Sequence, residues 1–171
     1  ISLFAKKKII TPSIASSASF AYDPNGEIYF VGSGGGGGGG YGIILSDSCE
    51  LSYEYILGLL NSTLLDFFLK KISSIFSGGY FAYNRQYIEQ LPIRTITFDD
   101  PADRDRHDRM VALVERMLSL HRELAAAREP HQRTALQRQI DATDAQIDAL
   151  VYELYGLTDD EIAVVEGAGR N

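Results

Sequence analysis

The sequence of 171 residues has no tryptophan, only two methionines and a single cysteine, Cys49. A lone cysteine cannot form a disulfide within the chain, which is typical of proteins in a reducing, cytoplasmic compartment. Long apolar runs are also missing, because the most apolar stretch, residues 55–69, is interrupted by three polar residues and by Asp66. Such a stretch is too polar to cross a bilayer, so the sequence predicts no membrane span.

Residue patterns that carry catalysis or bind metals are missing as well. No serine lies in a G-x-S-x-G turn, and His107, His121 and His131 do not have the spacing of metal ligands. The carboxylate-rich stretch at residues 100–109 contains no lysine and precedes a predicted helix. Carboxylates there suit the helix dipole, so we expect a solvated helix start rather than a nuclease site. The sequence predicts no catalytic residue and no metal site in this chain.

Charge and aromatic residues divide the chain into two parts. Residues 1–98 contain seven Lys or Arg and seven Asp or Glu, whereas residues 99–171 contain nine Arg and sixteen Asp or Glu. The second part therefore accounts for the whole formal net charge of −7. All five lysines and sixteen of the eighteen aromatic residues lie in the first part. We predict two domains, residues 1–98 and residues 99–171.

The first part has the patterns of a mixed α+β domain. Short β-branched and aromatic runs predict strands at residues 7–11, 27–32 and 41–45, with a turn at Asp-Pro-Asn-Gly, residues 23–26. Apolar residues at spacings of three and four predict one buried helix over residues 52–72. A break at residues 77–79 is followed by a loop and a short helix that ends before Pro92.

The second part has the heptad pattern of two packed helices. Apolar residues alternate at spacings of three and four over residues 103–128 and again over residues 132–155. Pro130 separates the two, since proline cannot continue a helix interior, so we expect an antiparallel, coiled-coil-like hairpin. Gly156 is a candidate C-cap, and Thr158 with Glu161 has the spacing of a capping box.

Seven consecutive glycines, Gly34–Gly40, allow three interpretations. A flexible linker fits poorly, because strand-like segments of one domain lie on both sides. A phosphate-binding loop requires Lys and Ser or Thr, or a following helix, but here Tyr41 and Gly42 start a predicted strand. The third interpretation is a long loop with bare backbone, whose N–H groups can lie directly against DNA or a neighbouring domain.

Three stretches together resemble one protein family: residues 53–73, residues 77–93 and residues 147–167. In this order they are similar to the TaqI-like C-terminal specificity domain of type IIG restriction–modification enzymes and to the tails of phage-defence adenine methyltransferases. Type I specificity subunits are similar in plan. The glycine run is longer than is usual in this family.

The resemblance implies a division of labour. Residues 1–98 would be the target-recognition domain that selects a double-stranded DNA sequence, and residues 99–171 would be a spacer. A nuclease segment and an adenine methyltransferase would lie upstream, and this expectation agrees with a chain that starts at Ile1 without a methionine or a signal peptide. The parent enzyme would use S-adenosylmethionine and Mg²⁺. The fragment itself would have no cofactor and no enzymatic activity, and its helical hairpin could support self-association.

Candidate DNA-binding residues follow from the resemblance and from residue chemistry. Cations contact phosphates, bidentate groups read base edges, and aromatic rings stack on bases. The candidates are Lys6, Lys7, Lys8, Ser16, Ser17, Gly36, Gly38, Tyr41, Lys71, Ser77, Tyr80, Tyr83, Asn84 and Arg85. Weaker candidates are Ser13, Ser19 and Lys70. Lys70 and Lys71 also suit the dipole at the end of the predicted helix. Phe81 and Tyr87 are expected in the core.

A second interpretation needs no DNA. Residues 1–98 are neutral and have no dense basic patch, as expected of a protein-interaction module with a coiled-coil dimerisation arm. Because DNA affinity comes mainly from Lys and Arg at phosphates, salt-dependent duplex binding separates the two interpretations.

Overall fold

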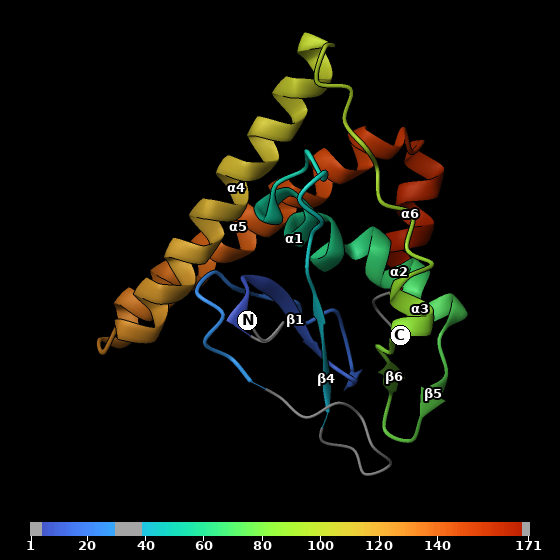
Figure 1. The fold of residues 1–171 in the computed structure, drawn as a ribbon. Helices are drawn as coiled ribbons and strands as arrows, with labels where there is room; N and C mark the ends of the chain where they lie inside the picture. The colour runs from blue at the N-terminus through green and yellow to red at the C-terminus, as the bar shows by residue number, and fades with distance from the viewer. Residues whose placement is uncertain (1–4, 30–38, 169–171) are drawn as a thin grey trace.

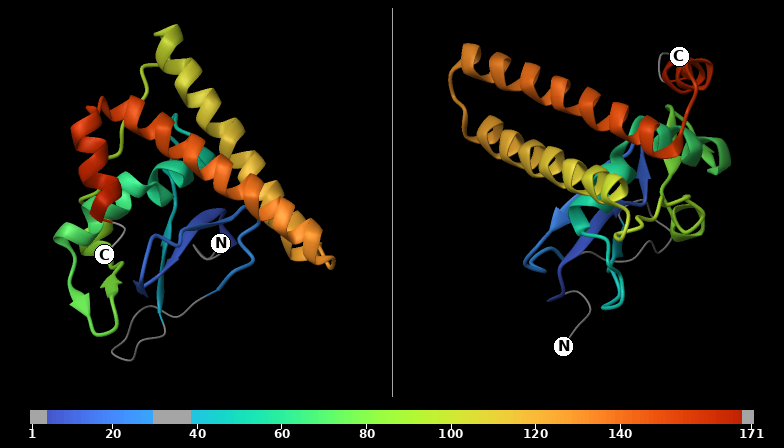
Figure 2. Two further views of the ribbon diagram at one scale, coloured as in Figure 1. Left: turned by 180° about the vertical axis from the view of Figure 1, so that it is seen from behind. Right: turned by 90° about the horizontal axis from the view of Figure 1, so that it is seen from above.

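The computed structural model describes residues 5–29 and 39–168. The described residues form two small antiparallel sheets and six helices, with the long helices on one side of the molecule (Figures 1 and 2). The mixed α+β class and the helical hairpin predicted from the sequence are therefore confirmed. None of the helices in the described ranges is long and apolar enough to cross a membrane.

Two three-stranded sheets share the N-terminal segment. The first has the order β3-β1-β4, with β1 at Lys8–Pro12, β3 at Ala21–Asp23 and β4 at Gly40–Ile43. The second has the order β2-β6-β5, with β2 at Ile14–Ala15, β5 at Ile75–Phe76 and β6 at Tyr80–Ala82. Ser13 joins the sheets, because its N–H donates to the Gly39 carbonyl and its own carbonyl accepts from the Tyr83 N–H, both at 2.9 Å.

The strand predictions are confirmed in part. β1 and β4 lie where the sequence placed them, and residues 24–26 form the predicted turn, with Gly26 at φ 67° packed against the backbone of Ala5. Residues 27–29 form no strand, and residues 30–32 lie outside the described ranges. The glycine run lies between β3 and β4, which both pair with β1 and not with each other.

The single helix predicted over residues 52–72 is wrong. Two helices replace it, α1 at Tyr53–Asn61 and α2 at Thr63–Ile72, because Ser62 is extended at ψ 151°. The Ser62 hydroxyl accepts from the Leu65 N–H, and the Asp148 carboxylate accepts from the Thr63 N–H at 2.8 Å and from its hydroxyl at 2.5 Å. The break is therefore stabilised by caps, one of which is distant in sequence.

A short helix and a clamped crossover connect the two parts of the chain. The short helix, α3 at Arg85–Ile88, ends before Pro92 as predicted. The Tyr155 hydroxyl donates to the Pro92 carbonyl at 2.5 Å and accepts from the Arg94 N–H at 3.1 Å. The Arg94 guanidinium in turn pairs with Asp103 at 2.8 Å. The connection between α3 and α4 is therefore held at Pro92 and Arg94 by the side chains of Tyr155 and Asp103, and Asp103 also accepts from the Thr97 N–H at 2.8 Å.

The helical part is the predicted antiparallel hairpin. It consists of α4 at Pro101–Ala126 and α5 at Pro130–Tyr155, followed by α6 at Asp159–Ala168. Gly156 ends α5 in the left-handed conformation at φ 65°, and Glu161 accepts from the Thr158 N–H at 2.8 Å, as the capping box requires. The heptad positions predicted for α5 are all buried: Leu136, Ile140, Thr143, Ile147, Leu150 and Leu154.

One hydrophobic core extends over both parts of the chain. It joins residues of β1 and α1, such as Ile9 and Leu59, to residues of the hairpin, such as Met110 and Val151. A second, smaller cluster of Leu120, Ala127, Leu136 and Ile140 stabilises the far end of the hairpin. The base of the helical hairpin is thus packed on α1, and the hairpin tip extends beyond the sheets (Figure 2).

Candidate nucleic-acid interface

Several of the predicted DNA-binding segments gather at one end of the molecule. The β5–β6 hairpin, residues 75–82, projects there, and the β4 end near Gly40 points in the same direction (Figure 1). Ala15, the last residue of β2, pairs with Phe81, and Ser16 and Ser17 directly follow this end of β2. Ser13 contributes to this arrangement, because its backbone bonds connect Gly39, near the end of the glycine run, to Tyr83 beside the β5–β6 hairpin.

The tip of the β5–β6 hairpin is apolar and exposed. Tyr80 is 46% exposed, and its neighbours Ile75 and Phe76 are 72% and 43% exposed. The sequence interpretation named Tyr80 and Ser77 but not Ile75 or Phe76. A usable signal was present, since both directly precede a Ser-Gly-Gly turn, although their spacing of three and four from Ile72 also continues the helical periodicity.

The candidate cations differ in their solvent exposure and in their ion pairs, which decide whether they can contact phosphates. Lys6, Lys7 and Lys71 are exposed, and Lys7 and Lys71 each place Nζ 5.1 Å from an aromatic ring centroid. Arg85 is exposed at the start of α3 and makes a surface ion pair with Glu89 at 3.2 Å. Surface pairs of this kind are weak, so Arg85 can exchange Glu89 for a phosphate or a base edge.

Lys8 is a correction to the predicted interface. Its side chain is buried, and its Nζ lies 2.6 Å from Oδ2 of Asp23. Asp23 also accepts from the N–H groups of Glu27 and Ile28, both at 3.0 Å. The hydrogen bond from Lys8, aided by these N–H groups, lowers the pKa of Asp23 to about 2. Lys8 therefore ties the turn after β3 to β1 and lies too deep to contact a phosphate.

Tyr83 is a second correction. It is fully buried, and its hydroxyl donates to Oδ1 of Asp66 at 2.5 Å. Burial, together with this carboxylate, raises the pKa of Tyr83 far above its usual value. Asp66 also accepts from the Ala18 N–H at 2.8 Å and pairs with Lys70 at 2.7 Å. Tyr83 and Asp66 thus position residues 13–19, the serine segment, against α2. Because it is buried, Tyr83 cannot stack on a base.

The remaining candidates occupy mixed positions. Asn84 is half-buried at the N-cap position of α3, where its side chain makes no capping hydrogen bond. Phe81 and Tyr87 pack against the core, as expected. Ser13 is buried, whereas Ser16, Ser17, Ser19 and Ser77 are exposed. Gly36 and Gly38 lie outside the described residues.

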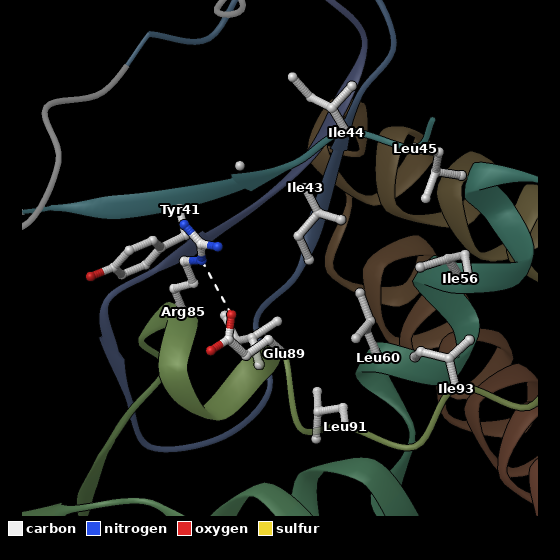
Figure 3. Close-up of a pocket in the computed structure, with 12 residues that line it drawn as sticks. Tyr41, Ile43, Ile44, Leu45, Ile56, Leu60, Arg85, Glu89, Leu91 and Ile93 are labelled. Atoms are coloured by element: carbon white, nitrogen blue, oxygen red, sulfur yellow. Dashed lines mark hydrogen bonds and ion pairs between the residues drawn. The ribbon is translucent and has the colours of Figure 1, made fainter. Parts of the chain in front are cut away.

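An apolar pocket of about 570 Å³ opens beside β4. Ile43, Ile56 and Leu60 converge on it from β4 and α1, as Figure 3 shows. Tyr41 also lines the pocket. Among the described lining residues, the only charged side chains are Arg85 and Glu89, which form an ion pair with each other. The pocket therefore offers a surface for packing rather than an acid–base pair for catalysis.

Metal-binding chemistry is not supported by the described part of the chain. Within residues 5–29 and 39–168, no group of three or more His, Cys, Asp and Glu side chains could hold a metal ion. His107, one of the histidines noted in the sequence, is buried between the rings of Tyr55 and Phe98, each 5.1 Å away. It acts there as a core aromatic residue.

The fold and the surface define a small α+β module with a helical appendage, and comparison with known proteins identifies its family. Residues 1–93 match the family of TaqI-like C-terminal specificity domains. This match covers more than half of the chain, so the chain belongs to that family. All the candidate interface residues lie within the matched range.

A curated relative extends the comparison to the helical part. The chain is 29% identical over 158 residues to an Escherichia coli protein described as the type II restriction enzyme and methyltransferase RM.Eco57I. The alignment covers 91% of this chain but 16% of the relative. The chain thus spans about a sixth of the length of that relative and includes the α4–α5 hairpin in the similarity.

Proposed function

We propose that this chain is the DNA-target recognition module of a type IIG-like restriction–modification enzyme and that it lacks the catalytic domains of that enzyme. The observation that carries the proposal is the gathering of the serine segment, the end of the glycine run and the β5–β6 hairpin at one end of the family-matched region. The nuclease and adenine methyltransferase would occupy the remainder of a much longer protein, in keeping with the relative's length. The chain alone would have no enzymatic activity.

The two parts of the chain would have different partners. Residues 1–98 would contact double-stranded DNA, and residues 99–171 would form the spacer that packs against the methyltransferase. The acidic excess of residues 99–171 would be repelled by DNA, and the tip of the α4–α5 hairpin extends to a different side from the β5–β6 hairpin (Figure 1). S-adenosylmethionine and Mg²⁺ would be bound by the catalytic domains of the parent enzyme.

Recognition would combine phosphate and base contacts. Lys71 and the exposed serines would hold the duplex by its backbone, which fixes the register of the domain on DNA. Arg85 presents a planar fork of donors that suits the major-groove edge of guanine, and Asn84 has the amide that suits adenine. Both residues lie at the start of α3, so a small shift of one helix would bring them to adjacent bases.

The proposal is tested by selection from a randomised duplex pool at two salt concentrations, followed by sequencing of the bound DNA. We expect an enriched short motif and an affinity that falls as salt rises, with Lys71→Ala reducing the slope of log K against log salt by about 0.9. Arg85→Ala should relax the motif, whereas Arg122→Ala on an exposed position of α4 should not. Absence of duplex binding even at low salt would contradict the proposal for this chain.

The protein-interaction module remains the second candidate, and the apolar pocket beside β4 favours it. In this view the pocket would receive a side chain of another protein, and the α4–α5 hairpin would self-associate. Sedimentation of the chain over a range of concentrations tests the second part, since self-association makes the apparent mass rise with concentration. A constant monomer mass together with salt-dependent DNA binding would reject this candidate.

A further inference from the structure

We propose that the β5–β6 hairpin is a wedge that inserts the rings of Phe76 and Tyr80 between stacked base pairs of the bound duplex. This proposal rests on the proposed DNA-recognition function and adds a named element and a mode of contact to it. It concerns how the domain deforms DNA, in addition to which sequence it selects.

The first argument is the pairing of the two rings. Phe76 and Tyr80 are directly opposite each other in the β5–β6 register, so their side chains lie on the same face of the hairpin. The next pair, Ile75 and Phe81, lies on the opposite face by the alternation of strands. Phe81 packs against the core, whereas Phe76 and Tyr80 remain 43% and 46% exposed. The structure thus presents two adjacent rings outside the core.

The second argument is the shape of the turn. Gly78 and Gly79 have φ of 85° and 78°, a left-handed conformation that glycine adopts without strain. A Cβ at Gly79 would meet nothing within 4 Å, so the backbone conformation and not local packing favours glycine there. The tip therefore has a bare backbone beside its two rings. A tip without side chains at two successive positions can approach the base pairs closely.

The third argument is charge, which selects DNA over a protein as the occupant. From Asp66 to Glu89 the sequence has three cations, Lys70, Lys71 and Arg85, and two carboxylates, which gives a net charge of +1 in a chain of net charge −7. Lys70 pairs with Asp66 and Arg85 with Glu89 in partly or fully exposed ion pairs, which are weak enough to exchange for phosphates. Lys70 lies against the hairpin itself, with Nζ 5.4 Å from the centroid of the Phe81 ring. α2 ends just before the hairpin and α3 begins just after it, so cations flank its base on both sides. A polyanion complements this arrangement of cations around exposed rings.

Known wedges combine the same parts. Apolar or aromatic side chains enter between base steps while nearby cations hold the phosphates, and the inserted group replaces the stacking that the opened step loses. Phe76 and Tyr80 would supply the stacking, and Lys71 and Arg85 would hold the phosphates. Ser77, at the tip, would contact the sugar–phosphate backbone beside the opened step.

The test measures binding of the complete chain to two forms of one duplex, one fully paired and one with a single central mismatch. The free energy needed to open a base step is smaller where a mismatch has already weakened the stacking, so the wild-type chain should bind the mismatched duplex more tightly. Phe76→Ala and Tyr80→Ala should each weaken binding about 5- to 150-fold, the effect of losing one base–aromatic stack, and should abolish the preference. Phe76→Trp should retain both properties.

The matched control is Val164→Ala, which truncates an apolar residue that is 63% exposed on α6. It should leave both affinities unchanged. Alanine variants that bind both duplexes as the wild type does would overturn the wedge, leave the recognition function standing and assign the exposed rings to a protein contact. A wild-type chain that binds neither duplex at low salt would overturn the recognition function and the wedge together.

Discussion

The contact between α1 and α4 can be tested by a double-mutant cycle at Gly58 and Met110. Gly58 lies on α1, and a Cβ built there would be 2.5 Å from the Met110 Sδ and 3.0 Å from the Val114 Cγ2. Met110 is fully buried in the core that joins the two parts of the chain. The cycle therefore reports on whether the helical hairpin is packed on residues 1–98 as described.

The expected free energies of unfolding follow from opposing terms. Gly58→Ala gains about 1 kcal/mol of helix propensity, and the added methyl loses about 1–3 kcal/mol by overpacking against Met110 and Val114, which leaves a net loss of about 0–2 kcal/mol. Met110→Ala creates a cavity and should cost about 2–5 kcal/mol. In the double variant the new methyl occupies space that Met110 has vacated. The combined loss should therefore be smaller than the sum by at least about 1 kcal/mol.

Urea unfolding followed by far-ultraviolet circular dichroism measures the four free energies. The control cycle uses Gly167→Ala, another helical glycine, whose Cβ would meet nothing within 4 Å. That substitution should be additive with Met110→Ala to within about 0.5 kcal/mol, because the two sites share no contact. Additivity of the Gly58 pair as well would refute the packing of α4 on α1 and would separate the two parts of the chain into independent units.

Two further predictions concern carboxylates that accept hydrogen bonds from the backbone. Lys8 lowers the pKa of Asp23 to about 2. The ionised Asp23 should therefore stabilise the fold above about pH 4, and this stabilisation should be lost as the pH falls toward about 2. Urea midpoints across this range should show the loss, and Asp23→Asn should remove that part of the pH dependence. Asp148→Ala removes the acceptor for the Thr63 N–H at the start of α2 and should cost about 0.5–2 kcal/mol in the same assay, whereas Asp148→Asn, which keeps an amide oxygen, should cost less.

The helical hairpin could be predicted from the sequence because its signals are local. Heptad spacing identified the buried face of α5, and Gly156 and Thr158 marked the boundaries that the structure confirms. Proline at residue 130 was sufficient to separate the two helices. Each of these signals acts within a few residues of its own position, so no knowledge of the tertiary contacts was needed.

The break between α1 and α2 could not be predicted in the same way. The apolar periodicity continues through residues 52–72, so it indicates one helix. The break at Ser62 depends on Asp148, which accepts two hydrogen bonds from Thr63 across a separation of 85 residues. A serine within an apolar helix pattern is ambiguous by itself, because its hydroxyl can either bond within the helix or cap a new one.

The candidate site failed where residue type was used without its register. Lys8 was assigned to phosphates because it is one of three consecutive lysines, yet strand alternation turns one of them inward. Its antiparallel register opposes it to Asp23, so the buried charge has a partner. Tyr83 was likewise chosen by residue type, but it lies just after β6, is buried, and donates to Asp66 of α2. In both cases the partner comes from another segment: strand pairing brings Asp23 to Lys8, and the packing of α2 brings Asp66 to Tyr83.

The placement of these charges bears on how a region without net charge could present a DNA surface. Lys8 and Asp23 are buried together, which removes one charge of each sign from the surface. Asp66 accepts from Tyr83, stays partly exposed and pairs with Lys70. Near the β5–β6 hairpin the carboxylates of Asp66 and Glu89 are paired with Lys70 and Arg85, and Lys71 is exposed, although residues 1–98 are neutral in sum. Net charge counted along the sequence is therefore a poor guide to this domain. Its affinity for a duplex would depend on which few charges remain at the surface, and Lys71 and Arg85 are the ones to test.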